Sequence, residues 1–281
     1  MTSAAVFAYH DVGVRCLRVL LEAGLHVPLV VTHRDDPAEK VWFGSVARLS
    51  REQGIETLED PDPAELQRRL QRLNPDFIFS FYYRRMLPPE WLALARRGSF
   101  NMHGSLLPKY RGRSPVNWAV LAGERETGAT LHEMVARPDA GRIVDQERVP
   151  IGEDDRAVDV MRRVTDAAEA VLRRSLGPLL AGTATLREQD LSAASYFGGR
   201  KPEDGRIDWS KSAREIHNLV RAVAPPYPGA FCKRFRILRT QLEPALRAPP
   251  GRLGPYREDD RWFAACGDGG VLRLLEIELN E

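Results

Sequence analysis

The residues of this chain whose types could do chemistry gather in the segment 99–145. Asn101 and His103 stand two residues apart at the end of an apolar run, and Asp139 follows in a Pro-Asp-Ala-Gly turn. Because side chains alternate along a strand, the first two should face the same side. An amide and an imidazole can donate hydrogen bonds to a developing oxyanion, the imidazole can relay an amine proton, and a carboxylate can fix the imidazole tautomer. The trio is therefore a candidate acyl-transfer set.

Each member of the trio also has an ordinary structural interpretation. A histidine at a strand end is more often a hydrogen-bonded polar residue than a catalyst, and Asn101 could simply form a turn. The sequence Asp139-Ala140-Gly141 is common in turns of many proteins. Residue types and spacing alone leave both interpretations open.

The elements that must position these residues alternate between short apolar runs and amphipathic segments. We predict strands at 4–9, 27–32, 76–81, 100–103 and 129–135, and helices at 14–23, 63–73 and 155–180. This order is typical of βαβ units, and we expect an α/β fold with a Rossmann-like, mostly parallel sheet and flanking helices. In such a sheet, ligands bind at the carboxyl ends of the strands, where Asn101 and His103 lie.

The composition and the pattern of predicted elements change near residue 204. Residues 190–210 are polar and loop-like, a helix is predicted at 213–223, and short strands are predicted at 231–238, 262–265 and 271–279. We therefore expect a catalytic domain over 1–204 and a small β-rich, OB-like domain over 205–281.

Composition narrows the class of protein. The formal net charge of the 281 residues is only +2, so global charge does not indicate a nucleic-acid partner. The three cysteines Cys16, Cys232 and Cys266 lie far apart and give neither a disulfide framework nor metal-ligand spacing. No apolar stretch approaches the length of a membrane span. The turn after the first strand carries only Gly13, so NAD or FAD binding is not supported. We expect a cytoplasmic protein without a metal or membrane insertion.

Three motifs in a fixed order resemble the signature of the 10-formyltetrahydrofolate-dependent formyltransferases. They are Asn101-x-His103-Gly-Ser-Leu-Leu-Pro-Lys-Tyr-Arg-Gly, then Gly123-Glu-x-Glu-Thr-Gly-x-Thr, then Asp139-Ala-Gly. The resemblance continues through 197–209 and the closing β segment. It implies a formyl transferase whose donor and co-substrate is 10-formyltetrahydrofolate, with Asn101, His103 and Asp139 as catalytic residues.

The same resemblance implies a folate site. Its residues would be Arg85, Met86, Leu87, Arg113, Val135, Ala136, Arg137, Pro138 and Asp139. Apolar residues could flank a flat pterin, and main-chain amides could read its edge. Arg113 could face an anionic group, or it could be an ordinary solvated charge.

Within the family, the chain is most similar to the formyltransferase half of the bifunctional polymyxin-resistance enzyme. That half formylates UDP-4-amino-4-deoxy-L-arabinose in lipid A modification. The matching segments include 7–11, 79–84, 103–113, 117–118, 221–224 and 266–269. The chain ends at Glu281 without the decarboxylase half, so we expect a separate NAD-dependent decarboxylase to supply the precursor.

Two alternatives remain open. A methionyl-tRNA formyltransferase should carry a strongly basic C-terminal domain, whereas residues from Gly205 onward hold 13 Lys and Arg against 10 Asp and Glu. The charges at Lys233, Arg234, Arg236 and Arg239 nevertheless form a cluster. A non-catalytic protein that binds folate or a sugar nucleotide is the second alternative, and the intact trio argues against it.

The loop beside the candidate trio carries one further expectation. It must turn sharply between Gly104 and Gly112, and together with the resemblance this favours a cis peptide bond at Leu107–Pro108.

Overall fold

The chain folds as two compact units that interleave along the sequence. The computed structural model describes residues 1–37 and 39–279. The first unit comprises 1–112, 128–149 and 163–196, and the second comprises 113–127, 150–162 and 197–281. The boundary at residue 204 expected from composition stays a prediction.

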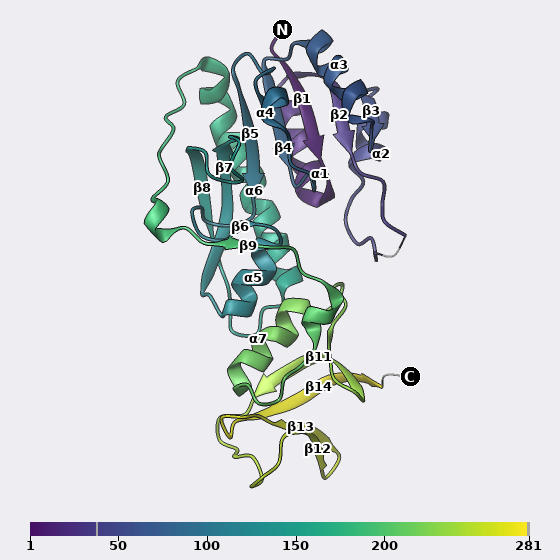
Figure 1. The fold of residues 1–281 in the computed structure, drawn as a ribbon, viewed down its shortest axis with the longest axis vertical. Helices are drawn as coiled ribbons and strands as arrows, with labels where there is room; N and C mark the ends of the chain where they lie inside the picture. The colour runs from purple at the N-terminus through teal and green to yellow at the C-terminus, as the bar shows by residue number, and fades with distance from the viewer. Residues whose placement is uncertain (38, 280–281) are drawn as a thin grey trace. The chain divides into compact units, whose positions relative to one another are not determined.

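A seven-stranded sheet forms the centre of the first unit (Figure 1). Its order is β3-β2-β1-β4-β5-β7-β8, and the pairs among the first five of these strands are parallel, whereas β5 and β7 are antiparallel. The mostly parallel α/β fold is thus confirmed. The strands are β1 Ser3–Ala8, β2 His26–Thr32, β3 Glu56–Glu59, β4 Phe77–Phe81, β5 Gly98–His103, β7 Glu126–Glu133 and β8 Ile143–Pro150.

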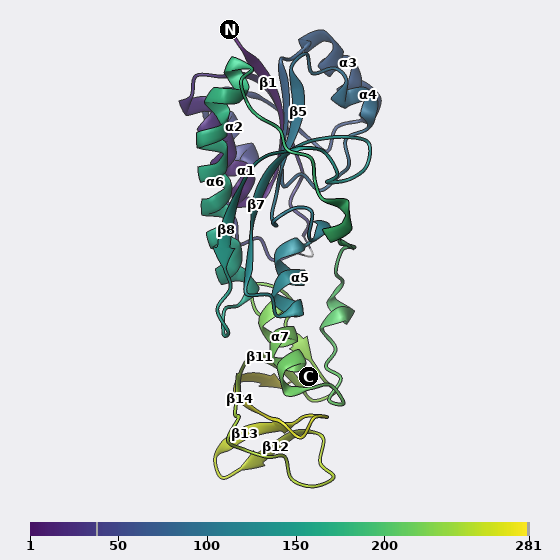
Figure 2. The same cartoon turned by 90° about the vertical axis from the view of Figure 1, so that its left-hand side faces the viewer.

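Helices cover both faces of this sheet (Figure 2). One face carries α1 His10–Glu22, α2 Val46–Glu52 and α6 Ala157–Ala181, and the other carries α3 Pro63–Leu73 and α4 Pro89–Leu92. The ends of α3 follow from its sequence, because Asp62 caps the first turn and Asn74 adopts the left-handed conformation that ends it. Its buried side chains Leu66 and Leu70 pack with Phe7 of the sheet.

The loop after β5 is tightly constrained. The Leu107–Pro108 bond is cis, as expected, and Tyr110 has a positive φ of 58°. The hydroxyl of Ser105 is fully buried and donates to the carbonyl of Lys109 at 2.6 Å. The short strand β6 Arg111–Gly112 ends the loop, and the Arg111 amide donates to the carbonyl of Ser195 at 2.9 Å. These contacts fix the main chain beside β5.

The second unit contains a five-stranded antiparallel sheet in the order β10-β11-β14-β13-β12. A β-rich C-terminal part is therefore confirmed. The single strand predicted at 231–238 is wrong, because the chain turns back at Lys233 and Arg234 and the strand splits into β10 and β11. The elements are α5 Pro115–Ala122, α7 Ala213–Val223, β10 Ala230–Phe231, β11 Phe235–Leu242, β12 Gly254–Glu258, β13 Arg261–Ala265 and β14 Val271–Leu279.

Short elements complete the description. Single turns of 3-10 helix occupy Leu191–Ala193 and Pro202–Gly205, and β9 spans Tyr196–Phe197. In the part of the chain that the structure describes, no helix combines the length and the apolar character needed to cross a membrane.

Candidate active site

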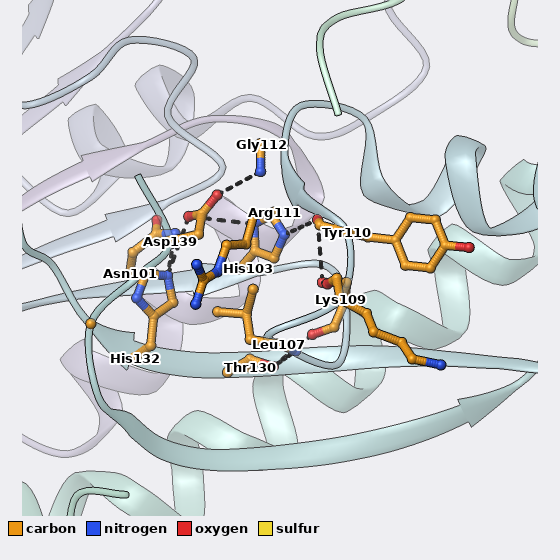
Figure 3. Close-up of polar contacts among 12 residues, drawn as sticks. Asn101, His103, Leu107, Lys109, Tyr110, Arg111, Gly112, Thr130, His132 and Asp139 are labelled. Atoms are coloured by element: carbon orange, nitrogen blue, oxygen red, sulfur yellow. Dashed lines mark hydrogen bonds and ion pairs between the residues drawn. The ribbon is translucent and has the colours of Figure 1, made fainter. Parts of the chain in front are cut away.

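The candidate site lies where β5 ends, within the first unit (Figure 3). The antiparallel register of β5 and β7 places Asn101 opposite His132 and His103 opposite Thr130. Asn101 and His103 are two residues apart on one strand, so their side chains leave the same face of the sheet. The pairing therefore adds a second imidazole to the amide and imidazole predicted from the sequence.

Asp139 reaches this group from the loop between β7 and β8. Its Oδ1 lies 3.7 Å from His103 Nδ1 and 3.4 Å from His132 Nε2, and the Gly112 amide donates to its Oδ2 at 2.8 Å. The turn needs a glycine, because a Cβ added at Gly141 would lie 2.0 Å from the carbonyl oxygen of Glu133. The structure thus brings together all three members of the trio.

The charge of Asp139 is strongly favoured in this setting. Burial by itself raises the pKa of the carboxyl group, but the charge of His103, the contacts with His132 and the Gly112 amide outweigh it. The pKa of Asp139 is therefore held well below its ordinary value. The carboxylate is anionic across the physiological range although its side chain is only 13% exposed.

The ring of His103 is fixed from both sides. Its Nε2 lies 2.8 Å from the carbonyl oxygen of Tyr110, and a carbonyl can only accept, so this nitrogen carries a hydrogen. Its Nδ1 faces the carboxylate of Asp139. With an oxygen acceptor near each nitrogen, the ring is held in one orientation beside Asp139.

His132 is the residue of this site that the sequence analysis missed. Its Nδ1 lies 2.8 Å from the carbonyl oxygen of Glu133, and its Nε2 lies 3.1 Å from Asn101 Nδ2. A carbonyl at Nδ1 requires the hydrogen there, which leaves a neutral Nε2 free to accept from the Asn101 amide. His132 is 1% exposed, so it contacts the Asn101 amide as a buried residue of β7.

Arg111 and Gln189, also missed, support the Asp139 turn. Gln189 Nε2 donates to the carbonyls of Asp139 at 2.9 Å and Gly141 at 2.6 Å, and Arg111 Nη2 donates to Gln189 Oε1 at 2.6 Å. Arg111 is only 2% exposed, and burial lowers its pKa. Its Nε is a buried polar atom that has no hydrogen-bond partner among the described residues. A buried guanidinium thus supports the Asp139 turn through Gln189.

The residues predicted to hold folate occupy two segments of the first unit. After β4, Arg85 forms an ion pair with Asp60 at 2.8 Å, Met86 is 60% exposed, and Leu87 is buried against Trp91 in the core beside α3. Leu87 could therefore offer a ligand its main chain only. The second segment leads from β7 to Asp139, with Val135, Ala136 and Arg137 exposed and Pro138 half-buried. A contact of either segment with folate stays a prediction.

Arg113, the remaining predicted folate residue, belongs to the second unit. Its side chain is exposed, and its amide donates to the carbonyl of Phe197 at 2.9 Å. Its folate contact also stays a prediction.

Comparison with known proteins identifies two matching family models. The model described as formyl transferase matches residues 14–176, and the model described as the formyl transferase C-terminal domain matches residues 200–281. Together these segments include every member of the candidate site except Gln189.

Solved structures show the same fold over nearly the whole chain. An N-formyltransferase from Helicobacter canadensis, in complex with folinic acid and dTDP-3-aminofucose, is 22% identical with a TM-score of 0.79, and the match covers 98% of this chain and 99% of that one. WlaRD, a sugar 3N-formyl transferase in the presence of dTDP and 5-N-formyl-THF, is 20% identical with a TM-score of 0.77, covering 99% and 98%. HypX from Aquifex aeolicus, in complex with tetrahydrofolic acid, is 20% identical with a TM-score of 0.65, covering 96% of this chain and 43% of HypX. At these identities the likeness establishes the fold.

Proposed function

Since the chain belongs to the formyl transferase family, we propose that it formylates the amine of a nucleotide-linked amino sugar. The family transfers the formyl group of 10-formyltetrahydrofolate, which is therefore the donor for this enzyme. The acceptor is supported by two proteins of the same fold whose structures hold dTDP-3-aminofucose or dTDP. The finer assignment, UDP-4-amino-4-deoxy-L-arabinose, rests on the sequence segments shared with the enzyme of lipid A modification and polymyxin resistance.

The observation that carries the catalytic proposal is the convergence of Asn101, His103 and Asp139 in one network of contacts. The neutral acceptor amine attacks the formyl carbon on N10 of the folate, and a new C–N bond forms as the formyl oxygen becomes an oxyanion. Asn101 and His103 stabilise the negative charge on that oxygen. The amine proton then passes to N10 as the C–N10 bond breaks, which releases tetrahydrofolate and the formamide product.

Asp139 keeps His103 in position for this step. Its carboxylate faces Nδ1 of the imidazole at 3.7 Å, and the Tyr110 carbonyl holds the opposite nitrogen. In the proposal the Asp139–His103 pair also relays the amine proton toward N10, directly or through a water. A protein that only binds folate or a sugar nucleotide has no need for such a pair.

The acceptor can be tested by direct competition. Purified protein is incubated with 10-formyltetrahydrofolate and one acceptor at a time, namely UDP-4-amino-4-deoxy-L-arabinose, a dTDP-amino sugar or methionyl-tRNA. Products are identified by mass and tetrahydrofolate release is followed in parallel, with the His103→Ala variant as the control for contaminating activity. We expect the UDP-amino sugar to give the highest kcat/KM. A preference for methionyl-tRNA would overturn the sugar assignment, and the absence of transfer to any amine would favour a non-catalytic binder.

A further inference from the structure

A pocket of about 380 Å³ lies in the second unit, beside the turn between β10 and β11. This volume falls within the range of small-molecule sites in proteins. The pocket contains none of the residues assigned to formyl transfer. Its walls are formed by Arg206, Ile207, Trp209, Phe231, Cys232, Lys233, Arg234, Phe235, Pro255 and Trp262.

One wall of the pocket is aromatic and held in place by packing. The buried ring of Phe235 meets Trp262 edge to face, with 5.0 Å between the ring centroids and 64° between their planes. Trp209 lies against Gly254, where an added Cβ would approach the indole to 3.3 Å. Gly254 also has a positive φ of 87°, so both its backbone conformation and the nearby indole favour glycine at this position. The two indoles therefore present apolar surface with little freedom to rearrange.

The rim of the pocket is cationic. The Cys232 amide donates to the carbonyl of Phe235 at 2.8 Å, which makes Lys233 and Arg234 the two residues of an exposed hairpin turn. The guanidinium of Arg234 lies 5.5 Å from the centre of the Phe235 ring. Arg206 is likewise exposed, with its guanidinium 5.9 Å from the Phe231 ring.

No described carboxylate pairs with these cations. Across residues 1–37 and 39–279, none of Arg206, Lys233 and Arg234 forms an ion pair with a carboxylate, and the described residues that line the pocket include no acid. Their positive charges stay available beside the aromatic wall. A ligand that matches both features needs a flat ring joined to an anionic group.

We propose that this pocket binds a nucleoside phosphate. Its base would stack on the aromatic wall, as bases stack on aromatic side chains in proteins that bind single strands. Its phosphate oxygens would meet the rim, where the two guanidinium groups can bind them through paired N–H donors. A free phosphate would make no contact with the indoles, and an uncharged apolar ligand would make no ion pair with the rim. A cationic ligand would be repelled by the rim. The site is separate from the residues of formyl transfer, so its occupant need not react.

The indole N–H signals of Trp209 and Trp262 report on this pocket directly. They are identified in 1H–15N spectra of the full chain from the Trp209→Phe and Trp262→Phe variants, and UDP, UMP, uridine, inorganic pyrophosphate and folinic acid are then titrated separately. We expect both signals to move saturably with UDP, and uridine to bind about tenfold more weakly because it lacks the charged contacts.

Charge-reversal variants test the rim. Lys233→Glu/Arg234→Glu should weaken the UDP effect by about tenfold or more, the loss expected when charged hydrogen bonds are removed. The matched control Arg236→Glu/Arg247→Glu makes the same change of charge at exposed residues outside the pocket and should keep wild-type binding. All four positions are exposed, so the variants should fold. Formyl transfer at saturating substrate should be unchanged in both.

Several outcomes would overturn the proposal. These are indole signals that do not move with any nucleotide, equal UDP binding in the rim variant and its control, and tighter binding of pyrophosphate or folinic acid than of UDP. Because the readout is the pair of tryptophans, it is independent of whether the chain formylates a sugar.

Discussion

His132 offers the sharpest test of how the candidate site is assembled. In His132→Ala the Asn101 amide loses its partner at 3.1 Å, and Asp139 loses one of its two imidazoles. If Asn101 and Asp139 act together in the transition state, both losses should lower kcat and leave folate binding nearly unchanged. His132 is 1% exposed, so it has almost no surface from which to bind a ligand.

The size of the effect follows from the contact with Asn101. Removing His132 leaves a donor of the Asn101 amide without its acceptor, which costs about 1–3 kcal/mol. This corresponds to a loss of about 5- to 150-fold in kcat/KM. The upper end is close to the roughly 100- to 1000-fold cost of removing an oxyanion donor itself. His132→Gln supplies a new acceptor near the Asn101 amide, so its loss should be smaller, about fivefold.

The assay combines steady-state formyl transfer with calorimetric binding of folinic acid, which reports folding and folate affinity without turnover. His26→Ala, which removes an exposed imidazole at the start of β2, serves as the matched control and should retain wild-type kcat. In the double variant Asn101→Ala/His132→Ala, the two losses should overlap rather than multiply, because both act on one group. A His132→Ala enzyme with wild-type kcat, or a loss confined to folate binding, would refute the reasoning.

Two further predictions concern the Asp139 turn. Asp139→Asn should lower kcat by about 100- to 10,000-fold, as expected for an acid–base pair, while folinic acid still binds. Because the pKa of Asp139 is lowered on folding, the carboxylate stabilises the fold above about pH 4, and this stabilisation is lost as the pH falls further. Thermal unfolding measured from pH 6 to pH 2 should therefore show a smaller loss of stability in the variant than in the wild type. Gln189→Leu leaves two buried carbonyls and the Arg111 guanidinium without their partner, and should lower the free energy of unfolding in urea by about 2–5 kcal/mol; an unchanged urea midpoint would show that water replaces Gln189.

Local signals in the sequence predict a large part of the fold. The helices predicted at 63–73 and 213–223 match α3 and α7, because a capping residue stands before each: Asp62 accepts from Glu65, and Ser212 forms a capping box with Glu215. The strand β8 was missed because three of its eight residues are charged and four consecutive residues are half-buried, so it shows no clear alternation. The β10–β11 turn was missed because Lys233 and Arg234 replace the Gly or Asn that usually marks a two-residue hairpin.

Some residues of the candidate site could likewise be predicted from the sequence, and others could not. Asn101 and His103 could be paired from the sequence because a two-residue spacing places both on one face of a strand. His132 could not, because its place opposite Asn101 depends on the register of an antiparallel pair. Arg111 and Gln189 are separated by 78 positions, and no local pattern links a buried guanidinium to an amide so far along the chain. Long-range register and burial are what the structure adds.

The charges gathered around Asp139 bear on the form in which the acceptor reacts. His103 and His132 both face this carboxylate, and Arg111 lies behind it with a buried guanidinium that stays charged. The Arg111 guanidinium and the Asp139 carboxylate carry opposite charges, so the group has no net negative charge that would stabilise a cation. Such surroundings disfavour an ammonium and favour the neutral amine, the only form with a lone pair for attack. They also stabilise the negative charge that develops on the formyl oxygen. One arrangement of charge thus serves both halves of the proposed step, because Asp139 stays anionic to orient His103 while the Arg111 guanidinium offsets its charge.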